Sequence, residues 1–283
     1  MAAGWDDLEL VEVGDGRFTT SLSEPWLLAV VPQGGAVAAV AVRAMERVLG
    51  HREQTLRTIT VMFAGQVAGG PVEVDVRVLR RGRSMSQLSA TVRNPGAEAG
   101  LTAIAAFGGP RRGFEFTELV MPTVPPAEEV RGFRDPLPDG IDFEFDGDPW
   151  PFWEQVVEGK PAIGTAPWEP WEDGPAEVAY WYRLDDPPLR ADGSLDPVGV
   201  VVMCDTMPGP VGQKVGRDSG DWFAPSIDFT LHLFRPAPTG WVLAHQRARH
   251  AGDGYASVEC ALWDPTGPHL VAYATQMMLF SFA

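Results

Sequence analysis

One stretch near the amino terminus, residues 31–50, constrains the fold more than any other. It is almost wholly apolar for eight residues from Gly35, and apolar residues then recur at helical spacing to its end. A helix that is apolar on every side belongs in a protein interior. Pro32 and Gly34 end the preceding segment and open the helix, and Gly50 stands where a C-terminal cap is expected. Because the flanking segments are rich in strand-forming residues, we expect one buried helix wrapped by a sheet.

The two glycines at the start of this helix, Gly34 and Gly35, permit two interpretations. The N–H groups of a first helical turn have no partner within the helix and lie at the positive end of its dipole. They can hold an anion or polarise a carbonyl group, which would make the glycines part of a substrate-binding site. Alternatively, they only let the helix pack closely against the sheet.

The pattern of strand, apolar helix and further strands occurs twice in the chain. After residue 176 it returns, with a helix predicted over 196–207 that Asp196 caps. The segment 58–63 corresponds to 226–231, an offset of 168 residues, and 101–107 corresponds to 270–276 at an offset of 169. We therefore expect two copies of one unit.

The residues between the two copies are rich in Pro, Gly, Asp and Trp. A structureless connection of this length is uncommon, so we expect its aromatic side chains to pack against the body of the protein. The predicted organisation is an N-terminal unit at 1–113, a connecting segment at 114–175 and a C-terminal unit at 176–283.

Charge and cysteine content exclude several classes of partner. The 38 acidic and 22 basic residues give a net charge of −16, which disfavours nucleic acid and anionic membranes. Cys204 and Cys260 form neither a disulfide framework nor a metal-binding spacing, and nothing indicates a metal or another cofactor. Neither a secretory signal nor an apolar run of roughly 18 residues is visible, so we expect a cytoplasmic protein.

The order of these segments resembles that of the double hotdog proteins, in particular the type II acyl-CoA thioesterases and the thioesterase-like proteins of actinobacteria. The resemblance is carried by residues 33–35, 80–85, 226–228, 249–254 and 274–276. It implies an α+β fold, a double hotdog in which two antiparallel sheets each wrap a central buried helix. The implied activity is hydrolysis of acyl-CoA to a free fatty acid and CoA, a reaction of lipid metabolism.

The resemblance also implies a catalytic site. An Asp and a Gln of such thioesterases hold and activate water, and here they match Asp228 and Gln276, positions at which the first copy carries other residues. The family's hydroxyl residue has no match, so Thr230, on the same strand face as Asp228, is a substitute. His250 is a rival base. Alternatively, Asp228 faces solvent, Gln276 is a polar strand end and His250 is structural.

Three arginines, Arg80, Arg81 and Arg83, form the one dense basic cluster of this acidic chain. Arginine suits phosphate recognition, so they are candidates for binding the CoA phosphates; alternatively, they are the solvated rim of a bulge. The resemblance implies a homo-oligomer, at least a dimer. A second possible function is binding of acyl-CoA or another acyl ligand without hydrolysis.

Overall fold

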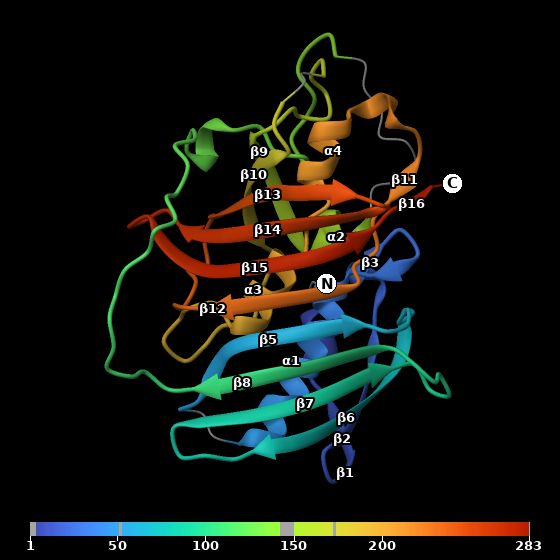
Figure 1. Ribbon diagram of the computed structural model, residues 1–283, viewed down its shortest axis with the longest axis vertical. Helices are drawn as coiled ribbons and strands as arrows, with labels where there is room; N and C mark the ends of the chain where they lie inside the picture. Colours follow the sequence, from blue (N-terminus) through green and yellow to red (C-terminus); the bar gives the residue numbers. More distant parts are fainter. Residues whose placement is uncertain (1–3, 51–52, 142–149, 172–173, 283) are drawn as a thin grey trace.

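A twelve-stranded antiparallel sheet dominates the computed structural model, which describes residues 1–283 except 1–3, 51–52, 142–149, 172–173 and 283 (Figure 1). In spatial order its strands are β1 (Val11–Gly14), β2 (Arg17–Leu22), β6 (Gly70–Arg80), β7 (Met85–Arg93), β8 (Leu101–Gly108), β5 (Thr55–Phe63), β12 (Asp228–Leu233), β15 (His269–Leu279), β14 (Tyr255–Asp264), β13 (Val242–Gly252), β10 (Glu177–Leu184) and β9 (Val157–Ile163).

Smaller elements complete the fold. Two short ribbons pair β3 (Leu27–Leu28) with β4 (Val31–Pro32) and β11 (Trp222–Phe223) with β16 (Ser281–Phe282). The α-helices are α1 (Gly34–Leu49), α2 (Pro151–Gln155), α3 (Pro197–Cys204) and α4 (Gly209–Val215). Single 3₁₀ turns lie at Trp5–Leu8, Glu24–Trp26, Ala127–Glu129 and Arg217–Ser219. No helix in the described ranges is long and apolar enough to cross a membrane.

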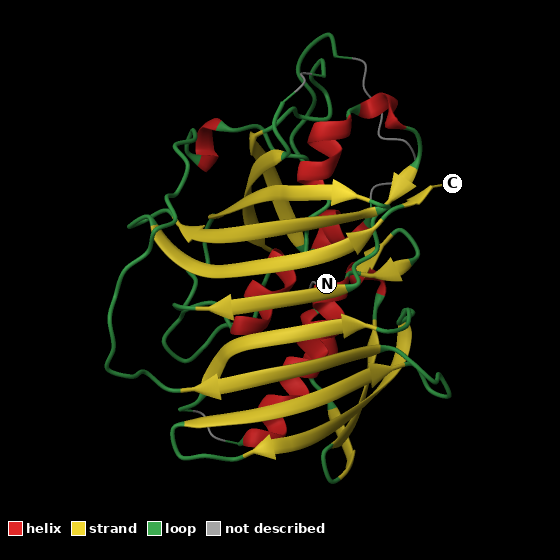
Figure 2. Ribbon diagram, in the orientation of Figure 1, coloured by secondary structure: helices red, strands yellow, loops and turns green. Residues whose placement is uncertain are grey.

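The sheet consists of two halves that meet at β5 and β12, where Thr60 lies opposite Thr230. The strands of the sheet up to β8 form one half and those from β9 onward form the other. The helices lie against one face of the sheet (Figure 2). This arrangement agrees with the predicted double hotdog. The two predicted sheets are joined edge to edge into one, because β5 and β12 pair with each other as well as with strands of their own halves.

The helix α1 is the buried helix that the apolar stretch predicts. Most of its residues from Gly35 onward are buried. Gln33 caps its start, accepting a hydrogen bond from Ala36 N at 2.8 Å, and Gly50 ends it with a φ of 67°, a conformation that favours glycine. Burial of this helix between sheet and α3 supplies the core of the N-terminal half.

The second buried helix, α3, lies antiparallel to α1. Gln33, at the start of α1, donates to Val202 O near the end of α3 at 3.1 Å. Arg43, in the second half of α1, pairs with Asp196 at the start of α3 at 3.2 Å. Each end of this helix pair therefore combines the start of one helix with the end of the other, as the two repeats require.

Part of the predicted connecting segment joins the body of the protein. Its residues 157–163 form the edge strand β9 beside β10, and Phe152 and Trp168 are buried, as expected of its aromatic residues. Phe114 and Phe116 differ: they are almost fully exposed, because this part of the segment runs along the side of the molecule without packing onto the sheet (Figure 1).

Candidate catalytic site

The start of α1 meets the end of α3 at a buried carboxyl group, Asp205, which directly follows α3. A Cβ on Gly34 would lie 2.6 Å from Asp205 Oδ2 and 2.9 Å from the Phe63 ring. A Cβ on Gly35 would lie 3.0 Å from Asp205 Cβ. Only glycines therefore let the first turn of α1 approach this carboxyl group so closely.

Asp205 is held by amide groups rather than by cations. Gln276 Nε2 donates to Asp205 Oδ1 at 3.0 Å, and Gln33 Nε2 lies 3.4 Å from Oδ2. Burial raises the pKa of Asp205 to about 7, against the opposing effect of hydrogen bonds from the Gly35 backbone and Gln276. Among the described residues no arginine or lysine forms an ion pair with it. A carboxyl group of this kind exchanges a proton near neutral pH.

Gln276, on β15, connects this carboxyl group to a hydroxyl group. Its Nε2 donates to Ser226 Oγ as well as to Asp205. Its carbonyl oxygen Oε1 is buried and has no hydrogen-bond partner within the described part of the chain. Because unpaired buried acceptors are rare and costly, this oxygen marks a position for a donor from water or substrate.

Local sequence explains how these groups come together. Gln33 uses both ends of its amide: Oε1 caps α1, and Nε2 donates to the Asp205 backbone oxygen at 2.5 Å. Thr206 Oγ1 donates to Met203 O at 2.9 Å and fixes the end of α3. Alternation along β15 turns Gln276 inward, where it is 4% exposed, whereas Met277 faces outward. The positive end of the α1 dipole favours a negative charge at Asp205.

The predicted pairing of Asp228 with Gln276 does not form. Asp228 lies opposite outward-facing residues on β5 and β15, and its Oδ1 accepts a hydrogen bond from Met277 N at 2.7 Å. Thr230 faces the same outer side, where its hydroxyl group bonds that of Thr60 at 3.2 Å. Gln276 points to the inner face. Because successive side chains of a strand point to opposite faces, Gln276 and these two residues lie on opposite sides of the sheet.

The other predicted site residues also occupy separate places. His250 is exposed near the end of β13. Arg81 donates to the carbonyl groups of Val48 and Leu49 and so caps the end of α1. This end lies about 24 Å from the start of the 16-residue helix. The predicted cluster of Arg80, Arg81 and Arg83 therefore does not gather around Asp205. Of the residues predicted for the site, only Gly34, Gly35 and Gln276 lie at the Asp205 carboxyl group.

Sequence reasoning missed Gln33, Asp205 and Ser226. Asp205 carries the one charged side chain in the apolar residues 197–207, and a carboxylate at a helix C-terminus is electrostatically unfavourable unless another element compensates for it. That conflict is the signal that could have identified it. Ser226, two residues before Asp228, places a hydroxyl group within hydrogen-bond reach of Gln276.

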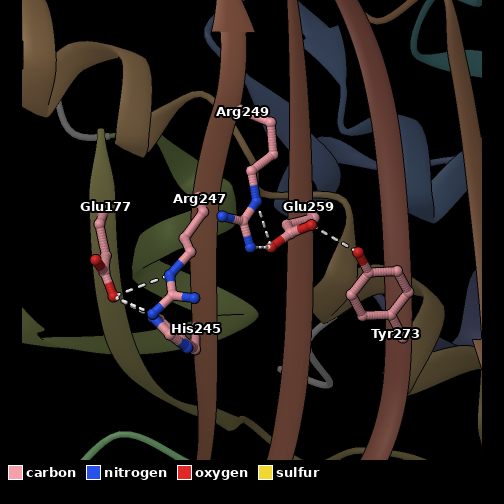
Figure 3. Close-up of polar contacts among 6 residues, drawn as sticks. All are labelled: Glu177, His245, Arg247, Arg249, Glu259 and Tyr273. Carbon is pink, nitrogen blue, oxygen red and sulfur yellow. Dashed lines mark hydrogen bonds and ion pairs between the residues drawn. The ribbon is translucent and has the colours of Figure 1, made fainter. Parts of the chain in front are cut away.

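A second polar cluster lies on the outer face of the C-terminal half (Figure 3). Its members come from four neighbouring strands and are Glu177, His245, Arg247, Arg249, Glu259 and Tyr273. We call it the outer cluster. Despite the opposing effect of partial burial, hydrogen bonds from His245 and Arg247 hold the pKa of Glu177 below its usual range. Glu259 behaves likewise with Arg249 and Tyr273. The charged groups of the outer cluster are thus already paired with one another.

Metal ligation has no candidate in the described residues, since no group of three His, Cys, Asp or Glu side chains is arranged to hold an ion. Cys204 and Cys260 are buried free thiols. The chemistry available at the Asp205 site is therefore that of a carboxyl group, two amides, a hydroxyl group and a helix N-terminus.

Comparison with known proteins relates both halves to one enzyme family. Residues 22–108 match the family model described as the acyl-CoA thioesterase N-terminal domain, and residues 133–280 match the acyl-CoA thioesterase C-terminal domain. The C-terminal match begins inside the predicted connecting segment. A search of curated proteins finds no match.

Solved structures share the whole fold. A conserved protein of unknown function with a hot dog fold from Alicyclobacillus acidocaldarius is 26% identical, with a TM-score of 0.81, and the match covers 100% of this chain and 99% of that one. A tesB protein from Mycobacterium avium subs paratuberculosis is 19% identical, with a TM-score of 0.76, and 97% of each chain is covered. The acyl-CoA thioesterase II TesB2 from Mycobacterium marinum is 19% identical, with a TM-score of 0.74 and 98% coverage of each chain. The predicted double hotdog fold and family resemblance are confirmed.

Proposed function

Because the chain belongs to the acyl-CoA thioesterase family, we propose that it hydrolyses acyl-CoA thioesters to a free fatty acid and CoA. One observation carries the proposal: the buried Asp205 carboxyl group, with a pKa of about 7, lies beside the unpartnered carbonyl oxygen of Gln276. These two acceptors can each take one hydrogen of a single water molecule. The water's lone pair is then directed away from both of them.

Asp205 is the general base in this mechanism, in place of Asp228. A base is most effective when its pKa is near the working pH, and a positioned base contributes about 10²–10⁴ in rate. Gln276 orients the water, and Ser226, which accepts a hydrogen bond from Gln276 Nε2, positions the amide.

Gly34 is the best candidate for binding the thioester oxygen. Its N–H begins α1 and has no hydrogen-bond acceptor in the described residues, whereas the Gly35 backbone already bonds Asp205. Gly34 and Ser226 are partly exposed, so the site opens on this side. A preorganised N–H group at the positive end of a helix stabilises the charge that develops on the oxygen.

Hydrolysis involves two proton transfers through Asp205. Water transfers a proton to the Asp205 carboxylate as its oxygen bonds the carbonyl carbon, which gives an oxyanion next to Gly34 N–H. The carbonyl re-forms as the carbon–sulfur bond breaks. Asp205 then gives its proton to the CoA thiolate, which leaves a fatty acid, free CoA and the ionised carboxylate.

The test compares Asp205→Asn with Asp228→Asn, since each replaces one carboxylate by an amide of equal shape. We measure thiol release from acyl-CoAs of short, medium and long chain, and thermal melting reports folding. Asp205→Asn should lower kcat by about 10²–10⁴, and Asp228→Asn should stay near the wild-type rate. The wild-type rate should fall about tenfold per pH unit below 7, as Asp205 becomes protonated.

Two outcomes contradict the proposal. If Asp228→Asn loses the activity and Asp205→Asn keeps it, the base is the outer residue. If the wild-type protein releases no thiol from any chain length, the protein binds acyl ligands without hydrolysing them.

A further inference from the structure

A pocket of about 690 Å³ lies at the opposite end of α3 from Asp205. It is lined by Pro197 and Val200 of α3, by Thr55 at the start of β5 and by Leu233 at the end of β12. Since α3 has eight residues, about 12 Å separates its two ends. We call this cavity the α3 pocket. It shares none of its lining residues with the Asp205 site.

The α3 pocket is the repeat-related counterpart of the Asp205 site. The antiparallel pairs β5–β12 and α1–α3 relate the two halves by an approximate two-fold rotation, which exchanges the two ends of each pair. At the offset of 169 residues between these two strands, Gln276 corresponds to Phe107, the residue before Gly108, which lines the α3 pocket. The amide that would orient water is therefore missing there, and the pocket is unsuited to the proposed hydrolysis.

Arginines take the place of the hydrolytic groups. Four of them line the α3 pocket, Arg57, Arg111, Arg190 and Arg235, against two acidic residues, in a chain whose net charge is −16. Arg57 donates to Gly108 O at 2.9 Å and Arg235 pairs with the exposed Glu115. The side chains of Arg111 and Arg190 make no hydrogen bond or ion pair with any described residue. The Arg111 guanidinium group is thus available to an anion. The charge of Arg190 acts on the nearby Asp192 and Glu46 carboxyl groups without a direct contact, so its N–H groups are also available.

The remaining walls are mainly apolar. Leu195, Val200, Leu233 and Ala237 are buried residues that line the interior of the pocket. A guanidinium group binds a carboxylate through two parallel hydrogen bonds, and aliphatic walls favour an alkyl chain. A nucleotide would leave the polar groups of its base and ribose against these walls without partners.

We propose that the α3 pocket binds a fatty carboxylate, with its head group on Arg111 and Arg190 and its alkyl chain against α3 and β12. This ligand belongs to the product class of the proposed hydrolysis. The binding site itself does not depend on that function, because it uses none of the residues around Asp205.

Calorimetric titration of the full chain with sodium decanoate tests the proposal. Arg111→Glu should weaken binding roughly tenfold or more, as expected for loss of a charge-assisted hydrogen bond. Arg112→Glu is the matched control, since it makes the same charge change at the next residue, which does not line the pocket. Both variants should keep the wild-type hydrolysis rate and melting temperature. Equal affinities for Arg111→Glu and Arg112→Glu, or no binding to wild type, would overturn the proposal.

A decanoate analogue that carries a photoreactive diazirine locates the bound chain. Labelling should fall on the peptide that contains Leu233 and Ala237, and Arg111→Glu should reduce it. Asp205→Asn should leave both labelling and decanoate affinity unchanged, so failure of the proposed hydrolysis and failure of this site are distinguishable. Label confined to peptides of the Asp205 site would contradict the α3 pocket as the binding site.

Discussion

The Asp205 site and the outer cluster place carboxyl groups on opposite faces of one sheet, with opposite electrostatic outcomes. Asp205 is buried among amides without a cation, and its pKa rises to about 7. Glu177 and Glu259 are partly buried among arginines, and their pKa values fall. Both regions contain hydrogen-bonded acids, but only the inner one keeps a proton available near neutral pH. Glu46 on α1 has a pKa raised to about 7 by burial although it pairs with Arg43 at 2.8 Å, so a counter-cation does not by itself keep a carboxyl pKa low. The depth of burial, which the hydrogen bonds and charges of neighbouring groups oppose, separates an acid suited to proton transfer from one that stabilises the fold.

The pH dependence of stability should sharpen this comparison most. The pKa of Asp205 is about 7 in the folded protein against a model value of 3.8, so its ionisation opposes folding. Its stability cost is absent below pH 3.8 and grows as the pH rises towards 7. Asparagine has no such cost, and Asp205→Asn should therefore gain on the order of 2–3 kcal/mol relative to wild type between pH 5 and pH 8. Urea unfolding of both proteins at each pH measures it, and a constant difference would contradict the raised pKa.

Two residues of β15 separate the clusters by function. Gln276→Ala should lower kcat roughly tenfold, because another water replaces only part of the amide's orienting effect. Tyr273→Phe removes the hydroxyl group that donates to Glu259 at 2.7 Å on the outer face and should leave kcat unchanged. Thiol release by the two variants, compared at equal folded fraction, checks this. A loss of rate in Tyr273→Phe would show that the outer cluster participates in turnover.

The smallest effect is expected from Glu177→Gln in the outer cluster. Glu177 accepts hydrogen bonds from His245 at 2.6 Å and Arg247 at 2.9 Å, and loss of its charge should cost about 1 kcal/mol. The pKa of Glu177 is lowered in the folded protein from an ordinary value of 4.5. This contribution to stability is therefore fully present above pH 4.5 and is lost as the pH falls through the lower pKa of the folded protein. Urea unfolding at pH 7 and pH 4 measures the difference. An equal or larger difference at pH 4 would refute the sign.

Much of the architecture was predictable because periodicity reports burial. The apolar residues after Gly35 predicted α1, the cap at Asp196 predicted α3, and the two-fold repeat predicted paired halves. The exposed position of Phe114 was not predictable, because an aromatic residue carries no local signal for whether a long segment packs down.

The candidate site was predictable only in part. Gln276 and the glycines at the start of α1 were identified from the sequence, whereas Asp228 was chosen as the partner carboxylate. Asp228 and Gln276 lie on neighbouring strands, yet their side chains point to opposite faces. A strand position specifies a face only when the register with its neighbour is known.

By itself the sequence determined which segments are buried, that the unit occurs twice, and that Gln276 lies on a strand whose alternate residues are apolar. Only the tertiary structure decided which carboxyl group meets that amide. Asp205 is 71 residues from Gln276 in the chain and 172 from Gln33. The three meet because α3 packs antiparallel to α1 beneath β12 and β15. Hydrophobic periodicity reports which side of its own element a residue occupies, but the opposing residue depends on how separate elements pack.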